Sequence, residues 1–227
     1  MSLREFVKEL KGSRVEGELI KTIFLSVLTS FFTFVVIYYF RLRNIEGFFS
    51  KYGLFLFFVL LSYALILPSV RQVRAFRRFS CMTGMMIGMT IGMMAGFLAG
   101  FYVGATNGMF YGGVFGMSIG IIFGVWNGKC CGVMGAMEGL MAGFMGGLMG
   151  AMTAVMMFND NLKAAAVVMF LVCGAILFGL NYLIYKETKG EERVNEDNHF
   201  ITIFLSFLLT VITMLIMIFG PRSVLFQ

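Results

Sequence analysis

Long apolar stretches alternate with short polar or charged segments along this chain. Seven stretches of about 20 residues stand out, at residues 20–40, 53–70, 80–105, 109–127, 130–157, 163–185 and 199–219. An α-helix rises about 1.5 Å per residue, so about 20 residues cross the roughly 30 Å hydrocarbon core of a bilayer. The pattern predicts an all-α fold, a polytopic transmembrane helical bundle of about seven spans.

The alternation divides the chain into four parts. Residues 1–18 are charged, with apolar side chains on one helical face, and predict an interfacial amphipathic helix. Residues 19–79 hold two transmembrane helices, and residues 80–158 hold a Gly/Met-rich transmembrane core of three helices. Residues 159–227 hold two further transmembrane helices, separated by a charged loop at 186–198 that we expect on the cytosolic side.

Composition and charge agree with this interpretation. Of the 227 residues, 59% are hydrophobic and 13% are charged, against about 25% charged in an average soluble domain. The net charge of +6 comes from basic residues at the ends of the apolar stretches, where they act as topology signals. With the N-terminus in the cytosol, 13 of the 18 Lys and Arg residues fall on the cytosolic side. We therefore expect a multi-pass membrane protein whose partner is the lipid bilayer rather than nucleic acid, with its N-terminus cytosolic and its C-terminus outside.

Glycines dominate the middle of the chain at a helical spacing. Thirteen of them follow one another at intervals of four from Gly84 to Gly132, and a shifted series follows at 135, 139, 143, 147 and 150. Small residues at this spacing let two helix backbones approach closely in a membrane. The series predicts that the third, fourth and fifth spans form a tight bundle, and the same glycine faces could build a homo-oligomer or bind a partner in a membrane complex.

Two Asn-Gly pairs fall where these helices should end. Asn107-Gly108 and Asn127-Gly128 are twenty residues apart, about one bilayer crossing. A helix often ends on a glycine in the left-handed conformation, so we interpret both pairs as C-caps. An ion-binding role of the two asparagines is the alternative.

Methionines form a stripe on the fifth span, and Glu138 lies within it. Placed at 100° per residue, the methionines of this span share one helical face, and its glycines occupy a separate face. A carboxylate that faces lipid is costly. The methionine face is therefore predicted to point into the bundle or into a wet cavity.

Three interpretations of this stripe compete. Methionine can serve as flexible apolar filler around the glycines. Thioethers and thiolates can instead form a path for a soft cation, Cu(I), because these are the ligands that Cu(I) prefers. In a third interpretation, Glu138 is a proton or cation relay and the methionines only pack. The candidate ligands are Glu138, Met134, Met137, Met141 and Met145 on the fifth span, Met82, Met86 and Met89 on the third, and Cys81, Cys130 and Cys131 at the cytosolic ends of these spans. Cys173, midway along the sixth span, is interpreted as a small buried hydrophobe.

Residues 83–98 (TGMMIGMTIGMMAGFL) and 138–152 (EGLMAGFMGGLMGAM) resemble the glycine- and methionine-rich membrane module attached to some bacterial cupredoxin-domain proteins. The resemblance covers residues 81–157, and this chain adds two spans before that region and two after it. It implies copper handling, with Glu138 as the acidic position of the module.

The sequence shows no recognisable catalytic set. It contains one histidine, His199, and neither an H-E-x-x-H nor a C-x-x-C motif, so we do not expect an enzyme. The favoured hypothesis is an integral membrane protein that transports or handles Cu(I) along an intramembrane path lined by methionines and Glu138. The alternatives are a structural glycine-zipper scaffold or subunit of a larger complex, and a proton or cation channel that relies on Glu138.

Overall fold

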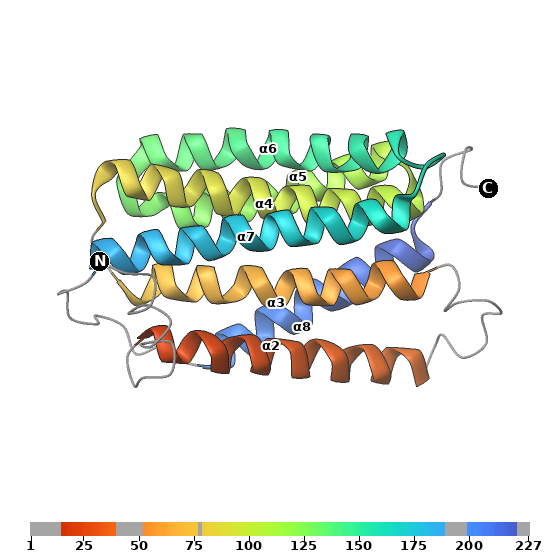
Figure 1. The fold of residues 1–227 in the computed structure, drawn as a ribbon, viewed down its shortest axis with the longest axis horizontal. Coiled ribbons are helices and arrows are strands. Elements are labelled where there is room, and N and C mark those ends of the chain that lie inside the picture. The colour runs from red at the N-terminus through yellow and green to blue at the C-terminus, as the bar shows by residue number, and fades with distance from the viewer. Residues whose placement is uncertain (1–14, 40–51, 77–78, 189–198, 222–227) are drawn as a thin grey trace.

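The computed structural model describes residues 15–39, 52–76, 79–188 and 199–221 (Figure 1). Within these ranges the chain forms seven long helices and one 3-10 turn, namely α2 (Val15–Ile37), α3 (Leu54–Ala75), α4 (Cys81–Asn107), α5 (Met109–Gly128), η3 (Lys129–Cys131), α6 (Gly132–Met156), α7 (Leu162–Thr188) and α8 (His199–Phe219). Six apolar stretches are long enough to cross a membrane, and one of them, Met109–Met156, contains both α5 and α6. The predicted all-α bundle is confirmed, and its apolar helices fit an integral membrane protein.

Helices α4, α5 and α6 form the tightly packed unit that the glycine series predicts. A Cβ atom added to Gly92 would lie 2.9 Å from Gly124 Cα on α5 and 3.0 Å from Gly139 O on α6. A Cβ atom on Gly116 of α5 would lie 2.6 Å from Gly100 Cα on α4. A Cβ atom on Gly124 of α5 would overlap Gly139 O of α6. Backbone therefore touches backbone in all three pairs, and the order of the glycine contacts makes α5 antiparallel to α4 and to α6.

This mode of packing suits a bilayer. Lipid tails are as apolar as leucine, so helices in a membrane associate through close contact and polar bonds rather than by the hydrophobic effect. Bare backbones at this separation gain dispersion energy along their whole length and bring Cα–H groups close to carbonyl oxygens of the neighbouring helix. The glycine faces of α4, α5 and α6 occupy one another, so these faces are not available for the oligomer or partner contact predicted through them.

Two glycines with positive φ let the chain reverse between these helices. Gly108, with φ 103°, follows α4, and its N–H donates to Gly104 O at 3.1 Å. The predicted cap at Asn107-Gly108 is thus confirmed in position. The prediction of a second cap at Asn127-Gly128 is wrong, because Gly128 has φ −72°. The positive φ falls instead on Gly132, at 74°, after the 3-10 turn. The three extra residues of η3 carry the reversal from α5 to α6.

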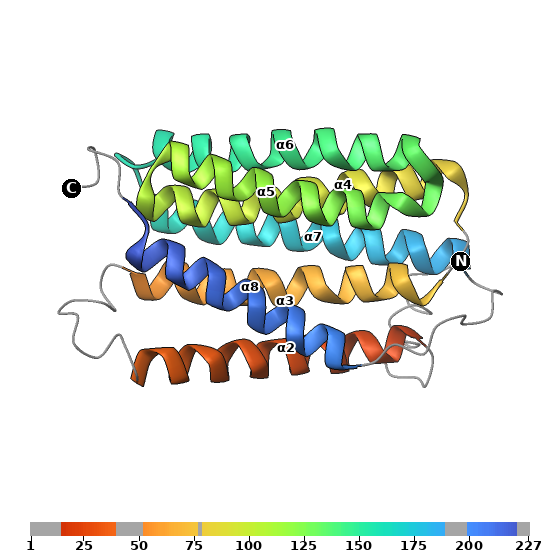
Figure 2. The same cartoon turned by 180° about the vertical axis from the view of Figure 1, so that it is seen from behind.

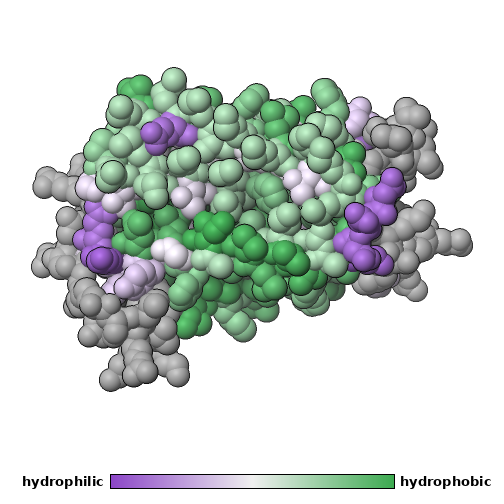
Figure 3. Space-filling model, turned by 45° about the horizontal axis from the view of Figure 1, so that its top comes forward, coloured by the Kyte–Doolittle hydropathy of each residue, from purple (hydrophilic) through white to green (hydrophobic). Residues whose placement is uncertain are grey.

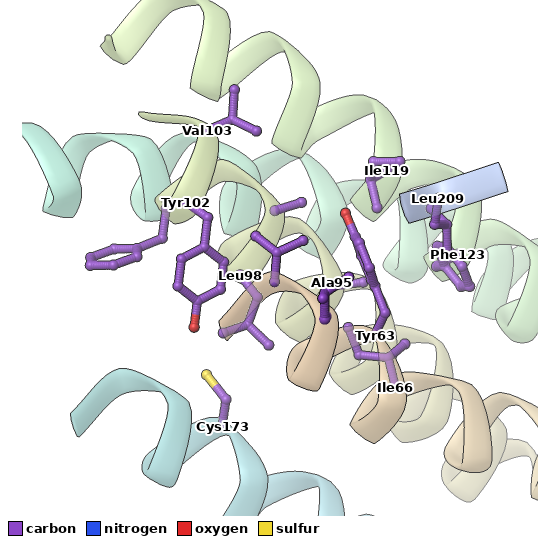
Figure 4. Packing of buried hydrophobic residues seen from close by; sticks show 14 of the residues in the cluster. Tyr63, Ile66, Ala95, Leu98, Tyr102, Val103, Ile119, Phe123, Cys173 and Leu209 are labelled. Carbon is purple, nitrogen blue, oxygen red and sulfur yellow. The ribbon is translucent and has the colours of Figure 1, made fainter. Parts of the chain in front are cut away.

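The remaining helices pack in layers beside this unit (Figure 1). Helices α3 and α7 lie next to it, with aromatic and aliphatic side chains in between; Phe58 of α3 stacks on Tyr102 of α4 with ring centroids 6.5 Å apart. Figure 4 shows Leu98 and Tyr102 within this apolar core. Helix α8 crosses obliquely from α2 toward the turn between α4 and α5 (Figure 2), where Asn107 Nδ2 donates to Ile216 O at 2.8 Å. Asn107 therefore has a structural partner in α8.

Helix α3 continues five residues beyond the predicted end at residue 70. Pro68 consequently lies seven residues before the end of the helix, a position that membrane helices tolerate because neighbouring groups satisfy the freed carbonyl. Arg71 is helical and buried, and its Nη1 donates to Thr22 Oγ1 of α2 at 2.6 Å. Arg71, one of the basic residues interpreted as topology signals, thus also joins α3 to α2 by a hydrogen bond.

Parts of the predicted domain division lie outside the described residues. This holds for residues 1–14 of the interfacial helix and for residues 189–198 of the charged loop. Residues 15–18 belong to α2, and Lys186 and Glu187 belong to the last turn of α7. Helix α2 begins and α8 ends at opposite ends of the bundle (Figure 1), as an odd number of crossings requires.

Candidate metal site

Two thiols meet in the turn between α5 and α6. Cys130 Sγ and Cys131 Sγ lie 4.0 Å apart. Cys131 Sγ lies 3.6 Å from Ser80 O, just before α4, and Cys130 Sγ donates to Asn127 O at 3.2 Å. A Cβ atom on Gly84 would overlap Cys131 Sγ and lie 3.0 Å from Cys130 Sγ. The absent side chain of Gly84 therefore leaves the space that the thiol pair occupies.

Cys81 lies at the same end of the bundle, one residue after Ser80. The three cysteines predicted to share one membrane side thus lie at one end of the α4–α6 unit. In the described ranges, however, no three His, Cys, Asp or Glu side chains come together as a metal-binding group, so Cys81 does not complete a site with the pair. Cys173 is 4% exposed and points from α7 toward Tyr102 and Leu98 (Figure 4), which confirms it as a buried hydrophobe.

The methionine stripe of α6 faces away from the bundle. Its members are between 43% and 68% exposed, namely Met134, Met137, Met141, Met145, Met149, Met152 and Met156. The predicted inward orientation is therefore wrong for a single chain. The physical reason is that the glycine face of α6 has to contact α4 and α5, and the opposite face then points outward whatever it carries. Figure 3 shows the resulting outer surface, which is largely hydrophobic.

Glu138 lies half-buried on the same outer face. It follows Gly132 by six residues, which places it about 9 Å along α6 from the end that carries the thiols. The α4 candidates Met82, Met86 and Met89 are also exposed, at 76%, 48% and 46%. Backbone contacts fill the space between α4, α5 and α6, so the two methionine sets do not enclose a common interior path within one chain.

A second polar feature escaped the sequence analysis. Hydroxyl groups line the contact between α2 and α8, where Ser206 Oγ lies 2.8 Å from Ser30 Oγ and accepts from Thr29 Oγ1 at 3.1 Å. The signal was present, since Ser and Thr recur at intervals of three or four on both helices: Ser26, Ser30 and Thr33 on α2, and Ser206, Thr210 and Thr213 on α8. Such side chains join membrane helices by hydrogen bonds, and here they attach α2 to the bundle.

No family model, curated protein or solved structure matches this chain. The resemblance of residues 81–157 to the copper-associated module stays a prediction.

Proposed function

We propose that this integral membrane protein binds Cu(I) at the Cys130–Cys131 pair and exchanges it with the methionines on the outer face of α6. The observation that carries the proposal is the 4.0 Å separation of the two Sγ atoms. Metal–thiolate bonds are about 2.3 Å long for zinc, so two sulfurs on one ion lie at most about 4.6 Å apart. The pair is thus within the range in which a single ion can bridge both sulfurs.

The donor chemistry favours a soft ion. Thiolates and thioethers select Cu(I), whereas Mg²⁺ and Ca²⁺ require oxygen ligands. Met134 follows Cys131 by three residues, and the methionine stripe then continues to Met156, about 33 Å further along α6. A row of neutral thioethers thus leads from the thiol pair across the thickness of a bilayer, and Glu138 contributes a negative charge near the end at which an ion bound by the thiols would enter the row.

An anaerobic Cu(I) titration of the purified protein against a competing chelator tests the proposal. We expect one tight site per chain, and more than about 100-fold weaker binding after Cys130→Ser/Cys131→Ser, because both anionic ligands are removed. Cys173→Ser is the matched control and keeps the affinity, since that thiol is enclosed by apolar side chains on α7. Absence of binding in the wild type, or equal binding by the double variant, contradicts the proposal.

A second variant tests the geometry without removing a ligand. The Cβ of Gly84→Ala would displace Cys131 Sγ, a side-chain atom that can rotate away, so the fold survives while the thiol pair is rearranged. We expect weaker Cu(I) binding and a changed sulfur shell in X-ray absorption. Gly113→Ala is the control, since its nearest neighbour is Leu148 Cδ2 at 3.4 Å.

A further inference from the structure

The outer face of α6 carries a regular seam of seven residues. Their spacing alternates strictly between four and three, at Met134, Glu138, Met141, Met145, Leu148, Met152 and Val155. This is the a/d pattern of a left-handed coiled coil sustained over three heptads. The glycines that contact α4 and α5 lie on the other side of the helix. One helix thus carries two packing faces, and the chain uses one of them internally.

The seam is open in the structure. Met134, Met141 and Met145 are 64%, 56% and 51% exposed, and Glu138 and Val155 are half-buried. Lipid tails could cover a seam made only of apolar side chains. They cannot cover Glu138 without a large free-energy cost, because it is ionisable, and such groups in membrane helices face protein or water. The position of this carboxyl group in the a/d pattern indicates that another helix covers the seam.

We propose that this helix is α6 of a second copy of the chain, so that the protein is a homodimer through the α6 seam. Two copies inserted in the same orientation are related by a twofold axis along the membrane normal, and their α6 helices then run parallel. In a parallel pair each a or d residue meets its own counterpart, so the pattern matches itself without a shift. The two Glu138 carboxyl groups meet near the axis, away from lipid, where they can share a proton or hold a cation between them.

The available surface is sufficient for such a contact. On α6, nine large apolar side chains on the seam or directly beside it, between Met134 and Met156, are 36–68% exposed. At about 200 Å² for a large side chain, they offer on the order of 1,000 Å², against about 800 Å² per partner in a stable interface. A polar residue at a single a position sets register and oligomeric state in coiled coils, and Glu138 occupies that position here.

Cysteine cross-linking tests the dimer in a variant in which Cys81, Cys130, Cys131 and Cys173 are replaced by serine. We expect Met141→Cys and Met145→Cys to form disulfide-linked dimers in native membranes under mild oxidation. Leu140→Cys is the matched control, because Leu140 is adjacent to Met141 and 41% exposed but lies off the seam. Val168→Cys, at a 56% exposed position on α7, reports on a dimer formed through a different face. Light scattering of the wild type in mild detergent should independently give the mass of two chains.

Each outcome decides the inference. Cross-linking at the two seam positions, with little at the controls, supports the α6 dimer. Equal or stronger cross-linking at Leu140→Cys or Val168→Cys overturns it, as does a monomeric mass without seam cross-links. The inference does not rest on metal binding, since the cross-linked protein lacks the thiol pair. A monomer that binds Cu(I) would refute the dimer alone, and a dimer that binds no Cu(I) would refute the proposed function alone.

Discussion

Adding one methyl group to Gly116 should separate α4 from α5. The new Cβ would lie 2.6 Å from Gly100 Cα and 2.8 Å from both Gly100 N and Gly96 O. Carbon atoms in contact are normally about 3.5–4.0 Å apart, so the backbones must move apart by about 1 Å. A gap of that size removes between a quarter and half of each dispersion contact along the interface. Overpacked cores lose about 1–3 kcal/mol, and here no side chain can rotate to relieve the overlap. We expect Gly116→Ala to lose about 3 kcal/mol of stability.

Gly113→Ala on the same helix is the matched control. Its Cβ would make an ordinary contact with Leu148 Cδ2 at 3.4 Å, and alanine favours a helix over glycine, so no loss is expected. The fluorescence of Trp126 reports unfolding in mild detergent, because it is the single tryptophan and Arg74 Cζ lies 4.2 Å from its ring centroid. A difference of about 3 kcal/mol corresponds to roughly 6–12 °C in Tm for a chain of this size. Equal melting temperatures for the two variants would refute the account of backbone contact.

Three further predictions concern other parts of the bundle. Asn107→Ala should cost about 1–2 kcal/mol and speed hydrogen exchange at the end of α8, because its amide donates to Ile216 O in α8 and to Pro221 O just beyond the helix. Asn127→Ala, which loses a bond within its own helix, should change exchange there little. Ser206→Ala should lower stability by about 1 kcal/mol by removing the hydroxyl that joins α2 to α8, with Ser118→Ala, on an exposed bond within α5, as the unaffected control. A membrane-impermeant thiol reagent should not label Cys130 on intact cells until the membrane is opened; labelling from outside would reverse the predicted orientation.

The fold could be predicted closely because membrane helices have simple requirements. Apolar length placed the seven helices to within a few residues, and the glycine spacing identified which three pack most tightly. The errors arose where a neighbouring helix decides the outcome. Helix α3 extends past residue 70 through Arg71 because α2 and other helices surround it, and the positive φ lies on Gly132 rather than Gly128 because a 3-10 turn intervenes.

The candidate site was predictable in composition but not in orientation. The sequence placed the methionines and Glu138 on one face of α6 and the cysteines at one end. We predicted that this face points into the bundle, because a carboxylate avoids lipid. In the structure, the glycine contacts on the opposite face determine the orientation of α6, and the methionine face points outward. The 4.0 Å approach of the thiols depends on the space beside Gly84, and only the packing of α4 against the turn reveals it.

The glycine backbone contacts between α4, α5 and α6 also determine how the protein can move. An interface formed by backbone atoms contains no rotamers to switch, so it cannot open gradually by side-chain rearrangement. These three helices should therefore move as one rigid body. Any conformational change must take place where larger side chains can repack, as at Phe58 and Tyr102 between α3 and α4, or where the chain is not helical, as in the link at 157–161 between α6 and α7. The thiol pair and the methionine stripe would travel together on this rigid unit, with their spacing unchanged.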